Sequence, residues 1–194
     1  MTEILQDRQY VLKLQQGDLS ALGVLYDRHR QMVYRTALAI TGDPEAAADL
    51  LQDVFLRLNR FSRRIDAERP LEPWLYRMTA NLCYTWMKRR NRFMRAVTEM
   101  AEWISREHHP TPQSITERDE EWDIVRKAVA ALPLQQRVVV VMYYINDCAI
   151  QEISEILDIP IGTVKSRLYY GRNTLKKQLG LQLDRIPEVN FEYT

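Results

Sequence analysis

Basic, aromatic and hydroxyl-bearing side chains share one stretch of this 194-residue sequence, residues 161–179. At about 100° per residue, Ser166, Tyr169, Tyr170 and Asn173 fall on one side of a helix there. No acidic residue interrupts the stretch, and five cations flank this side: Lys165, Arg167, Arg172, Lys176 and Lys177. Side chains of these kinds hydrogen-bond to base edges and pair with phosphates, which is typical of a helix in the major groove of DNA. The alternative is a solvated helix of a helical bundle, because short motifs also occur by chance.

The preceding residues predict a helix-turn-helix that would hold this helix in place. A short helix with one apolar face is indicated by spacings of three and four among Ile150, Ile153, Ile156 and Leu157. Residues 158–160 (Asp-Ile-Pro) interrupt it, because proline cannot continue a helix but can begin one. The second helix has its own inward stripe, formed by Val164, Leu168, Gly171 and Leu175.

A second basic and aromatic stretch covers residues 74–95, WLYRMTANLCYTWMKRRNRFMR, and is predicted to be helical. Aromatic rings interleaved with cations can stack on unpaired bases while the charges hold phosphates. The alternative is that the rings belong to the core and that the Lys88–Arg90 run is a solvated helix end, where cations are favourable. Composition does not decide between the two. Residues 62–73, SRRIDAERPLEP, are polar with two prolines and predict a loop.

The remaining sequence predicts further helices, at residues 5–17, 19–40, 44–61 and 120–131. Gly42 suits a left-handed helix end, Asp43 an N-cap and Pro44 a first helical position, which predicts a tight helix-to-helix junction. The stretch LQQRVVVVMYYI (residues 134–145) has strand propensity, but its apolar residues keep helical spacing. We therefore expect an all-α protein with two small helical domains and a flexible linker.

Charge is distributed unevenly, although the formal net charge is only +1. Residues 60–95 hold ten basic and three acidic residues, whereas residues 96–125 hold two basic and eight acidic ones. Such an asymmetry suggests nucleic-acid contact beside an acidic linker. The expected division is a domain at 1–95, a linker at 96–119, a second domain at 120–181 and a tail at 182–194.

Several functional classes find no support in the residues. Only two cysteines occur, so no disulfide framework is expected. The pair His108-His109 lacks metal-ligand spacing, and no catalytic constellation is present, so we expect no metal, no cofactor, no small-molecule substrate and no enzyme. His29 is expected to pack in the core. No apolar run reaches the roughly 18 residues of a membrane span and the N-terminus lacks signal-peptide character, so a soluble cytoplasmic protein is expected.

Two segments, in the same order, resemble the extracytoplasmic-function (ECF) class of bacterial sigma factors, the specificity subunits of RNA polymerase. Residues 25–61, LYDRHRQMVYRTALAITGDPEAAADLLQDVFLRLNRF, continuing into residues 73–92, resemble the family's region 2. Residues 132–179, from LPLQQRVVVV to GRNTLKKQL, resemble region 4. A single match to a helix-turn-helix would be weak, but the ordered pair is far more specific.

The resemblance implies a role for each surface. The core-polymerase contact would be made by Asp49, Gln52, Asp53 and Phe55, although Phe55 is equally compatible with the core. The loop at 61–73 matches the loop that captures a flipped base of the −10 promoter element, through Arg63, Arg64 and Asp66. The surface that melts the −10 region would be formed by Trp74, Tyr76, Arg77, Asn81, Lys88, Arg89 and Arg90. The −35 element would be read in the major groove by Thr163, Lys165, Ser166, Tyr169 and Tyr170, with Arg167 and Arg172 on phosphates.

The partners implied are core RNA polymerase, promoter DNA and an anti-sigma factor. Four departures qualify the match: Ala48 stands where an acid is common, Asp53 where glutamate is commoner, Asp158 where glycine is usual, and Tyr170 where a basic residue is frequent. The rival interpretation is a stand-alone helix-turn-helix regulator that binds DNA without polymerase. Such a regulator usually needs dimer symmetry, and no dimerisation helix is indicated.

Overall fold

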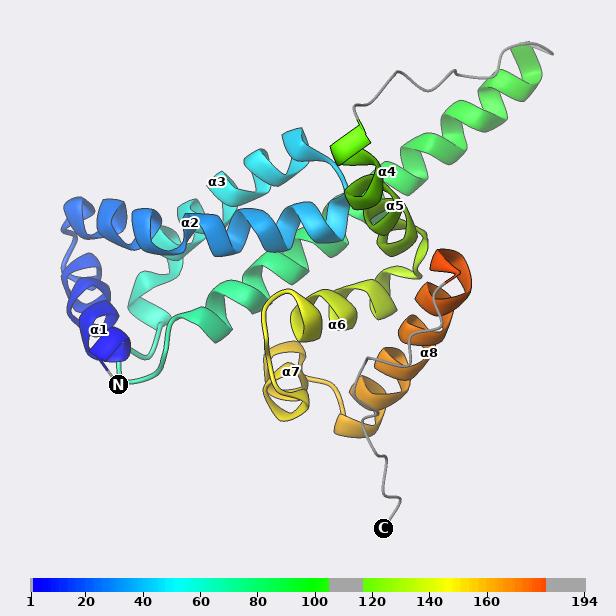
Figure 1. The fold of residues 1–194 in the computed structure, drawn as a ribbon. Helices are drawn as coiled ribbons and strands as arrows, with labels where there is room; N and C mark the ends of the chain where they lie inside the picture. The colour runs from blue at the N-terminus through cyan, green and yellow to red at the C-terminus, as the bar shows by residue number, and fades with distance from the viewer. Residues whose placement is uncertain (1, 105–116, 181–194) are drawn as a thin grey trace.

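The computed structural model describes residues 2–104 and 117–180, and within these ranges the secondary structure is entirely helical (Figure 1). This agrees with the predicted all-α class. His108, His109 and the 182–194 tail lie outside the described residues. The elements, in chain order, are α1 (Thr2–Gln15), α2 (Leu19–Thr41), α3 (Pro44–Phe61), the short 3-10 helix η1 (Ser62–Arg64), α4 (Glu72–Ile104), α5 (Glu117–Ala131), α6 (Leu134–Tyr144), α7 (Ile150–Leu157) and α8 (Ile161–Leu179).

Local chemistry explains where the first helices begin and end. The Asp18 carboxylate accepts a 2.9 Å hydrogen bond from the Ser20 amide and caps α2. Gly42 ends α2 in the left-handed region, with φ of 70°, which a residue with a Cβ atom adopts only at a cost. Asp43 then caps α3 by accepting from the Ala46 amide at 3.0 Å, and Pro44 begins the helix. The predicted junction is confirmed residue by residue.

Helices α1 to α4 form the N-terminal bundle, and α2 is its central element (Figure 1). Its buried stripe includes Leu25, Val33 and Ile40, which meet Leu50, Val54 and Leu58 of α3. His29 is also buried, as expected.

Helix α4 is longer than the sequence indicated. It begins at Glu72 and continues through the start of the expected linker to Ile104, so residues 96–104 are helical. The reason is local: no proline or glycine follows Pro73 until Pro110, and nothing there interrupts helical geometry. The last turns project away from the other helices (Figure 1).

Helices α5 to α8 form the C-terminal part. The valine-rich α6 is a helix as predicted, and Val138 to Met142 are all buried within it, so tertiary packing prevails over its strand propensity. Helix α8 crosses α6 closely at Gly171: a Cβ atom built there would lie 2.7 Å from Cγ2 of Val140. Glycine at this position therefore permits the close contact between the two helices.

The two parts pack against each other and share one continuous cluster of buried apolar residues. Helix α2 contacts α5 and α6, and α4 contacts α7. Polar contacts also cross this interface, among them two hydrogen bonds. The guanidinium of Arg137 donates to the Ile40 carbonyl oxygen at 2.7 Å, and the Thr36 hydroxyl lies 3.1 Å from Oδ1 of Asn146. None of the helices in the described ranges has the length and apolarity that crossing a membrane requires.

Candidate nucleic-acid interface

Helix α8 presents a polar surface because its apolar stripe is buried on α6 and α7. Val164, Leu168 and Gly171 are buried, whereas the side chains of Tyr169 and Tyr170 are 50% and 59% exposed. The two rings lie edge to face with centroids 5.5 Å apart. Two exposed tyrosines next to each other on a basic helix form a surface that suits contact with bases or phosphates.

The turn between α7 and α8 fixes the direction of α8. Asp158 ends α7 in the left-handed region, with φ of 55°, so the expected left-handed position is confirmed although aspartate replaces the usual glycine. The Ser154 hydroxyl donates to the Ile159 carbonyl oxygen at 2.6 Å and ties the turn to α7. Pro160 precedes the first residue of α8, as its fixed φ favours.

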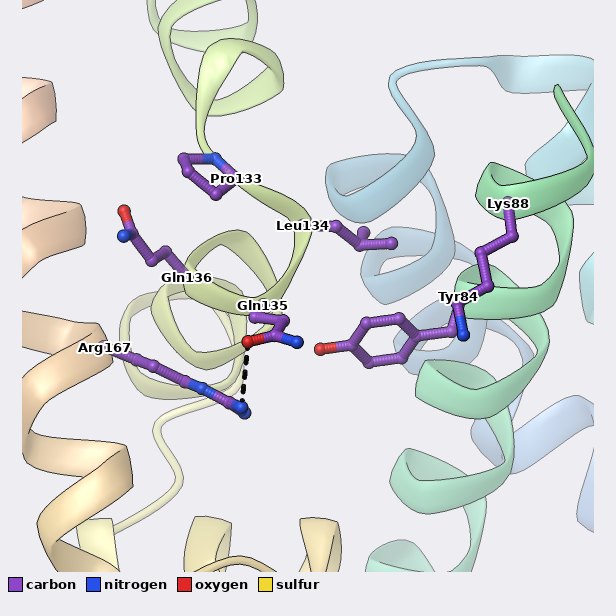
Figure 2. A pocket seen from close by; sticks show the side chains of 7 residues that line it. All are labelled: Tyr84, Lys88, Pro133, Leu134, Gln135, Gln136 and Arg167. Carbon is purple, nitrogen blue, oxygen red and sulfur yellow. Dashed lines mark hydrogen bonds between the residues drawn. The ribbon is translucent and has the colours of Figure 1, made fainter. Parts of the chain in front are cut away.

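Two of the residues predicted to contact the −35 element are held by neighbours. The Ser166 hydroxyl donates to the Thr163 carbonyl oxygen at 3.0 Å. Arg167 points toward α6 and donates to Oε1 of Gln135 at 3.0 Å, as Figure 2 shows. Arg167 is thus directed toward α6.

Arg167 lines a cavity of about 290 Å³ together with Tyr84 and Lys88 of α4. Figure 2 shows Arg167 on the opposite side of this cavity from the two α4 residues. Burial raises the pKa of the Tyr84 hydroxyl, and the nearby Arg167 partly opposes this rise. The fold therefore brings a residue predicted for the −10 surface, Lys88, near one predicted for the −35 surface.

The predicted −10 surface on α4 combines half-buried rings with exposed polar groups. Trp74 and Tyr76 pack partly against the core, while Arg77 and Asn81 are exposed. Burial, together with the nearby Cys148 and Glu72, raises the pKa of Tyr76 to about 12, so this hydroxyl stays protonated at neutral pH. Trp74 and Tyr76 are therefore half-buried: each packs partly against the core and keeps part of its surface exposed.

A cleft of about 720 Å³ separates this surface from α7. The loop and α4 supply Arg64, Trp74 and Arg77 on one side, and the α6–α7 connection and α7 supply Asp147, Glu152 and Glu155 on the other. The guanidinium of Arg77 lies 3.6 Å from the Asp158 carboxylate across the two parts. The cations predicted to bind DNA thus face acidic residues of the same chain.

The basic run at the middle of α4 is exposed. Arg90 lies over the Trp86 ring, 5.1 Å from its centroid, and its guanidinium is 3.7 Å from the carboxylate of Asp43. Lys88 and Arg89 are exposed on the same helix. The run is therefore exposed to solvent and available to a polyanion.

The loop at 61–73 places its charged side chains outward. Arg63 and Arg64 are exposed on η1, whereas Ser62 is buried beneath them. Asp66 accepts a 3.0 Å hydrogen bond from the Glu68 amide, and its carboxylate lies 3.3 Å from the Arg69 guanidinium. The loop is thus ordered by contacts of its own as well as by α1.

The outward face of α3 carries Asp49, Gln52 and Asp53, all exposed as predicted. Phe55 is different: it is only 4% exposed and packs edge-on against Tyr26, with ring centroids 4.9 Å apart. The structure therefore places Phe55 in the core, the alternative that its sequence position left open, and not on the surface where a polymerase contact would require it.

Sequence reasoning missed Leu56, which is 64% exposed beside Asp53. It lines a shallow hollow of about 260 Å³ with Arg57, Arg60 and Phe61. Helical spacing contained the signal, because Leu56 lies three residues after Asp53 and seven after Asp49 on the same face.

One cluster in the described ranges has metal-ligand character: Asp7, His29 and Glu72 bring potential ligand atoms within 4.8 Å of one another. The Asp7 carboxylate is already bonded to Arg28 at 2.8 Å and to Nε2 of His29 at 2.6 Å. Burial alone would raise the pKa of Asp7, but the bonds to His29 and Arg28 prevail and hold it below its usual range. The cluster is thus an ion-pair network, in which the Arg28 guanidinium opposes an added cation.

Comparisons with known proteins agree with this architecture. Residues 25–93 match sigma-70 region 2, and residues 122–175 match sigma-70 region 4. The chain is 27% identical over 179 residues to the ECF RNA polymerase sigma factor SigW of Bacillus subtilis, covering 89% of this chain and 96% of SigW. It is 32% identical over 167 residues to the ECF sigma factor SigE of Mycolicibacterium smegmatis, covering 84% of this chain and 64% of SigE.

Two solved structures share the fold. CnrH, solved in complex with the cytosolic domain of CnrY, matches with a TM-score of 0.66 and 21% identity over 90% of this chain and 97% of CnrH. The sigma factor RpoE of Bartonella quintana, solved with the anti-sigma factor NepR, matches with a TM-score of 0.62 and 20% identity, covering 88% of this chain and 99% of RpoE. The two sigma-70 regions in order and the two ECF sequence relatives establish that the chain belongs to the ECF sigma factors, which are transcription specificity factors.

Proposed function

We propose that this sigma factor binds core RNA polymerase and directs initiation at promoters whose −35 element it reads as duplex and whose −10 element it melts and captures. The observation that carries the proposal is the pair of polar surfaces on separate helices. Helix α8 exposes Tyr169 and Tyr170, and the loop with α4 exposes Arg63, Arg64 and Arg77. Each surface lies within one of the two matched sigma-70 regions.

In this mechanism promoter opening is a binding problem and not covalent catalysis. A base that leaves the stack costs a few kcal/mol, and stacking on aromatic side chains with cations on the phosphates offsets that cost. The half-buried Trp74 and Tyr76 line the cleft, and Arg64 and Arg77 supply charge there. For Arg77 to bind DNA, its contact with Asp158 must be exchanged for a phosphate; both groups are exposed, so this exchange costs little.

The core-polymerase contact is assigned to the outward face of α3. Asp49, Gln52 and Asp53 are exposed there, and Leu56 adds an apolar group in place of the buried Phe55. Carboxylates around an exposed leucine suit a partner with a basic and partly apolar surface, since charge steers encounter and apolar burial supplies affinity.

An anti-sigma factor is proposed as a further partner. The support is that the RpoE structure, which shares this fold, was solved with the anti-sigma factor NepR. A candidate anti-sigma factor should then compete with core polymerase for binding to this protein.

The test is a pull-down with bacterial core RNA polymerase, followed by run-off transcription on a pool of promoters randomised at −35 and −10. Core binding with a two-block consensus supports the proposal. Duplex DNA binding without core binding would favour the stand-alone regulator and withdraw the assignments on α3.

A charge-reversal variant separates the two predicted surfaces of the N-terminal bundle. Reversing the Lys88–Arg90 run should weaken promoter opening, because these exposed cations would hold the single strand, and should leave core binding intact. The control reverses the same number of exposed cations elsewhere: Arg30, Arg35 and Lys127. Equal loss of core binding in the Lys88–Arg90 variant would contradict the division into two surfaces.

A further inference from the structure

Helix α1, which carries none of the predicted contacts, holds the 61–73 loop from behind. The side-chain amide of Gln15 donates to the carbonyl oxygen of Ser62 at 3.1 Å and to that of Ile65 at 2.8 Å. These two carbonyls flank the side chains of Arg63 and Arg64, so a single amide group uses both of its donors to hold the two ends of η1. Both bonds are partly buried, which makes their loss more costly than that of a surface contact.

A second contact joins α1 to the middle of the same loop. Nε of Arg8 donates to Oε1 of Glu68 at 2.8 Å, and the same guanidinium forms an ion pair with that carboxylate. The two side chains are 44% and 67% exposed, so the contact adds little to the stability of the whole protein. Its importance is geometric, because it fixes the loop at a second point.

Helix α1 is itself firmly attached to the bundle. Val11 and Leu14 are buried in the core, and the buried Asp7 carboxylate is bonded to Arg28 and His29 of α2. Glu72, the first residue of α4, contributes its carboxylate to the same cluster. Helix α1 therefore connects the rigid α2 to both the start and the end of the loop.

We propose that Gln15 is a positioning residue for −10 recognition. By holding the Ser62 and Ile65 carbonyls it sets the direction in which Arg63, Arg64 and the following Asp66 meet the promoter. The inference rests on the proposed function, and it adds α1, outside the matched region 2 segment at 25–93, to the determinants of promoter selectivity.

The side-chain amide is what the geometry requires. Glutamate at position 15 has the same size but only acceptor oxygens, so Gln15→Glu would set a carboxylate against two carbonyl oxygens. Gln16 provides a matched control, because it is the next residue in the chain and its side chain is exposed. Gln16→Glu thus introduces the same charge one position away.

The experiment uses full-length protein with core polymerase and a promoter pool in which only the −10 element varies. Gln15→Glu should reduce the preference for the best −10 sequence over its single-base variants by roughly tenfold, as expected when two partly buried hydrogen bonds are lost. Core binding and the preference among −35 variants should stay within about twofold of the wild type, because those surfaces lie on α3 and α8. Gln16→Glu should match the wild type.

The outcomes separate this inference from the proposed function. If the wild type selects a two-block consensus but Gln15→Glu keeps the same −10 preferences, the positioning role is wrong and the sigma function stands. A uniform loss on all promoters with a lower melting temperature would also overturn it, because that is the signature of a purely structural role. If the wild type shows no −10 preference at all, the proposed function fails first.

A charge swap gives an independent measurement. Arg8→Glu alone should weaken −10 preference in the same direction as Gln15→Glu, and adding Glu68→Arg should restore it by re-forming the pair in reverse. Failure of the double variant to recover would show that the Arg8–Glu68 contact has no part in loop placement.

Discussion

The guanidinium of Arg137 donates a 2.7 Å hydrogen bond to the carbonyl oxygen of Ile40, 97 residues earlier in the chain. It also donates to Leu132 at 3.0 Å and to the Ala130 carbonyl. Ile40 lies in the last turn of α2 and Ala130 near the end of α5, where helical carbonyls lack partners within the helix. Arg137 is buried, and this burial, with nearby Arg90, lowers the pKa of its guanidinium. A single side chain thus joins the ends of two helices to α6.

Replacing Arg137 with methionine should destabilise the protein by about 2–4 kcal/mol, because three carbonyls lose their donor and two of these hydrogen bonds are buried. The stability of Arg137→Lys should lie between those of the wild type and Arg137→Met, since an ammonium group donates hydrogen bonds but cannot reproduce the planar fork of donors. The free energy of unfolding from urea denaturation is the measurement. The control is Lys127→Met on exposed α5, expected within about 0.5 kcal/mol of the wild type. Equal stability of the two methionine variants would contradict this role for Arg137.

Alanine substitutions at two glycines of α8 should change the stability of the protein in opposite directions. Gly171→Ala should lower stability by roughly 1–3 kcal/mol, because the new methyl group would lie 2.7 Å from Cγ2 of Val140. Gly162→Ala has open space around it and should gain roughly 0.5–1 kcal/mol from helix propensity. Thermal denaturation of the pair tests this, and a stabilising Gly171→Ala would mean that α6 and α8 are less closely packed than described.

Stability should fall in acid partly through Asp7. Its pKa in the folded protein lies below the ordinary value of 3.8, because its bonds to His29 and Arg28 outweigh the opposing effect of burial. The contribution is therefore present above the unfolded pKa and is lost as pH falls through the folded one. Asp7→Asn should remove this component, so wild type and variant should differ in unfolding free energy at pH 6 and converge in strong acid. A constant difference at all pH values would contradict the assignment.

The two cysteines should react slowly in the native protein. Burial raises the pKa of Cys83 to about 12, and burial with nearby Glu152 and Asp147 raises that of Cys148 to about 11, so little thiolate exists at pH 8. Cys148 lines the cleft between the loop and α7, whereas Cys83 is enclosed within α4. If core polymerase and promoter separate the two parts, iodoacetamide should modify Cys148 faster while Cys83 stays protected. Equal rates with and without these partners would indicate that the cleft stays closed.

Much of the local structure could be predicted from the sequence, because its causes are local. Helix-capping and helix-breaking residues predicted the α2–α3 junction at Gly42 and Asp43. The spacing of apolar residues identified α6 as a helix despite the strand propensity of its valines. The length of α4 was underestimated because the acidic excess of residues 96–125 favoured a linker, although residues 96–104 contain no glycine or proline that would end the helix.

The candidate surfaces were predicted less completely, because exposure depends on distant packing. Helical spacing does separate the buried Phe55 from its exposed neighbour Leu56, but contacts between distant elements follow no such rule. The contacts of Arg137 with Ile40 and of Arg77 with Asp158 join residues far apart in the chain, and no spacing rule encodes them. The hydrogen bonds from Gln15 to the loop could not be predicted for the same reason, since a single glutamine belongs to no recognisable sequence motif.

The three bonds of Arg137 all end on backbone carbonyl oxygens. Every residue type carries the same carbonyl, so exchanging the side chains at 40, 130 or 132 leaves the acceptors in place. In a genetic screen, mutations that break this connection should therefore arise at position 137 itself. A side-chain change at one of the three acceptor residues could not replace the lost guanidinium donors. Suppressors of an Arg137 variant should map instead to the apolar contacts that α2 and α6 share.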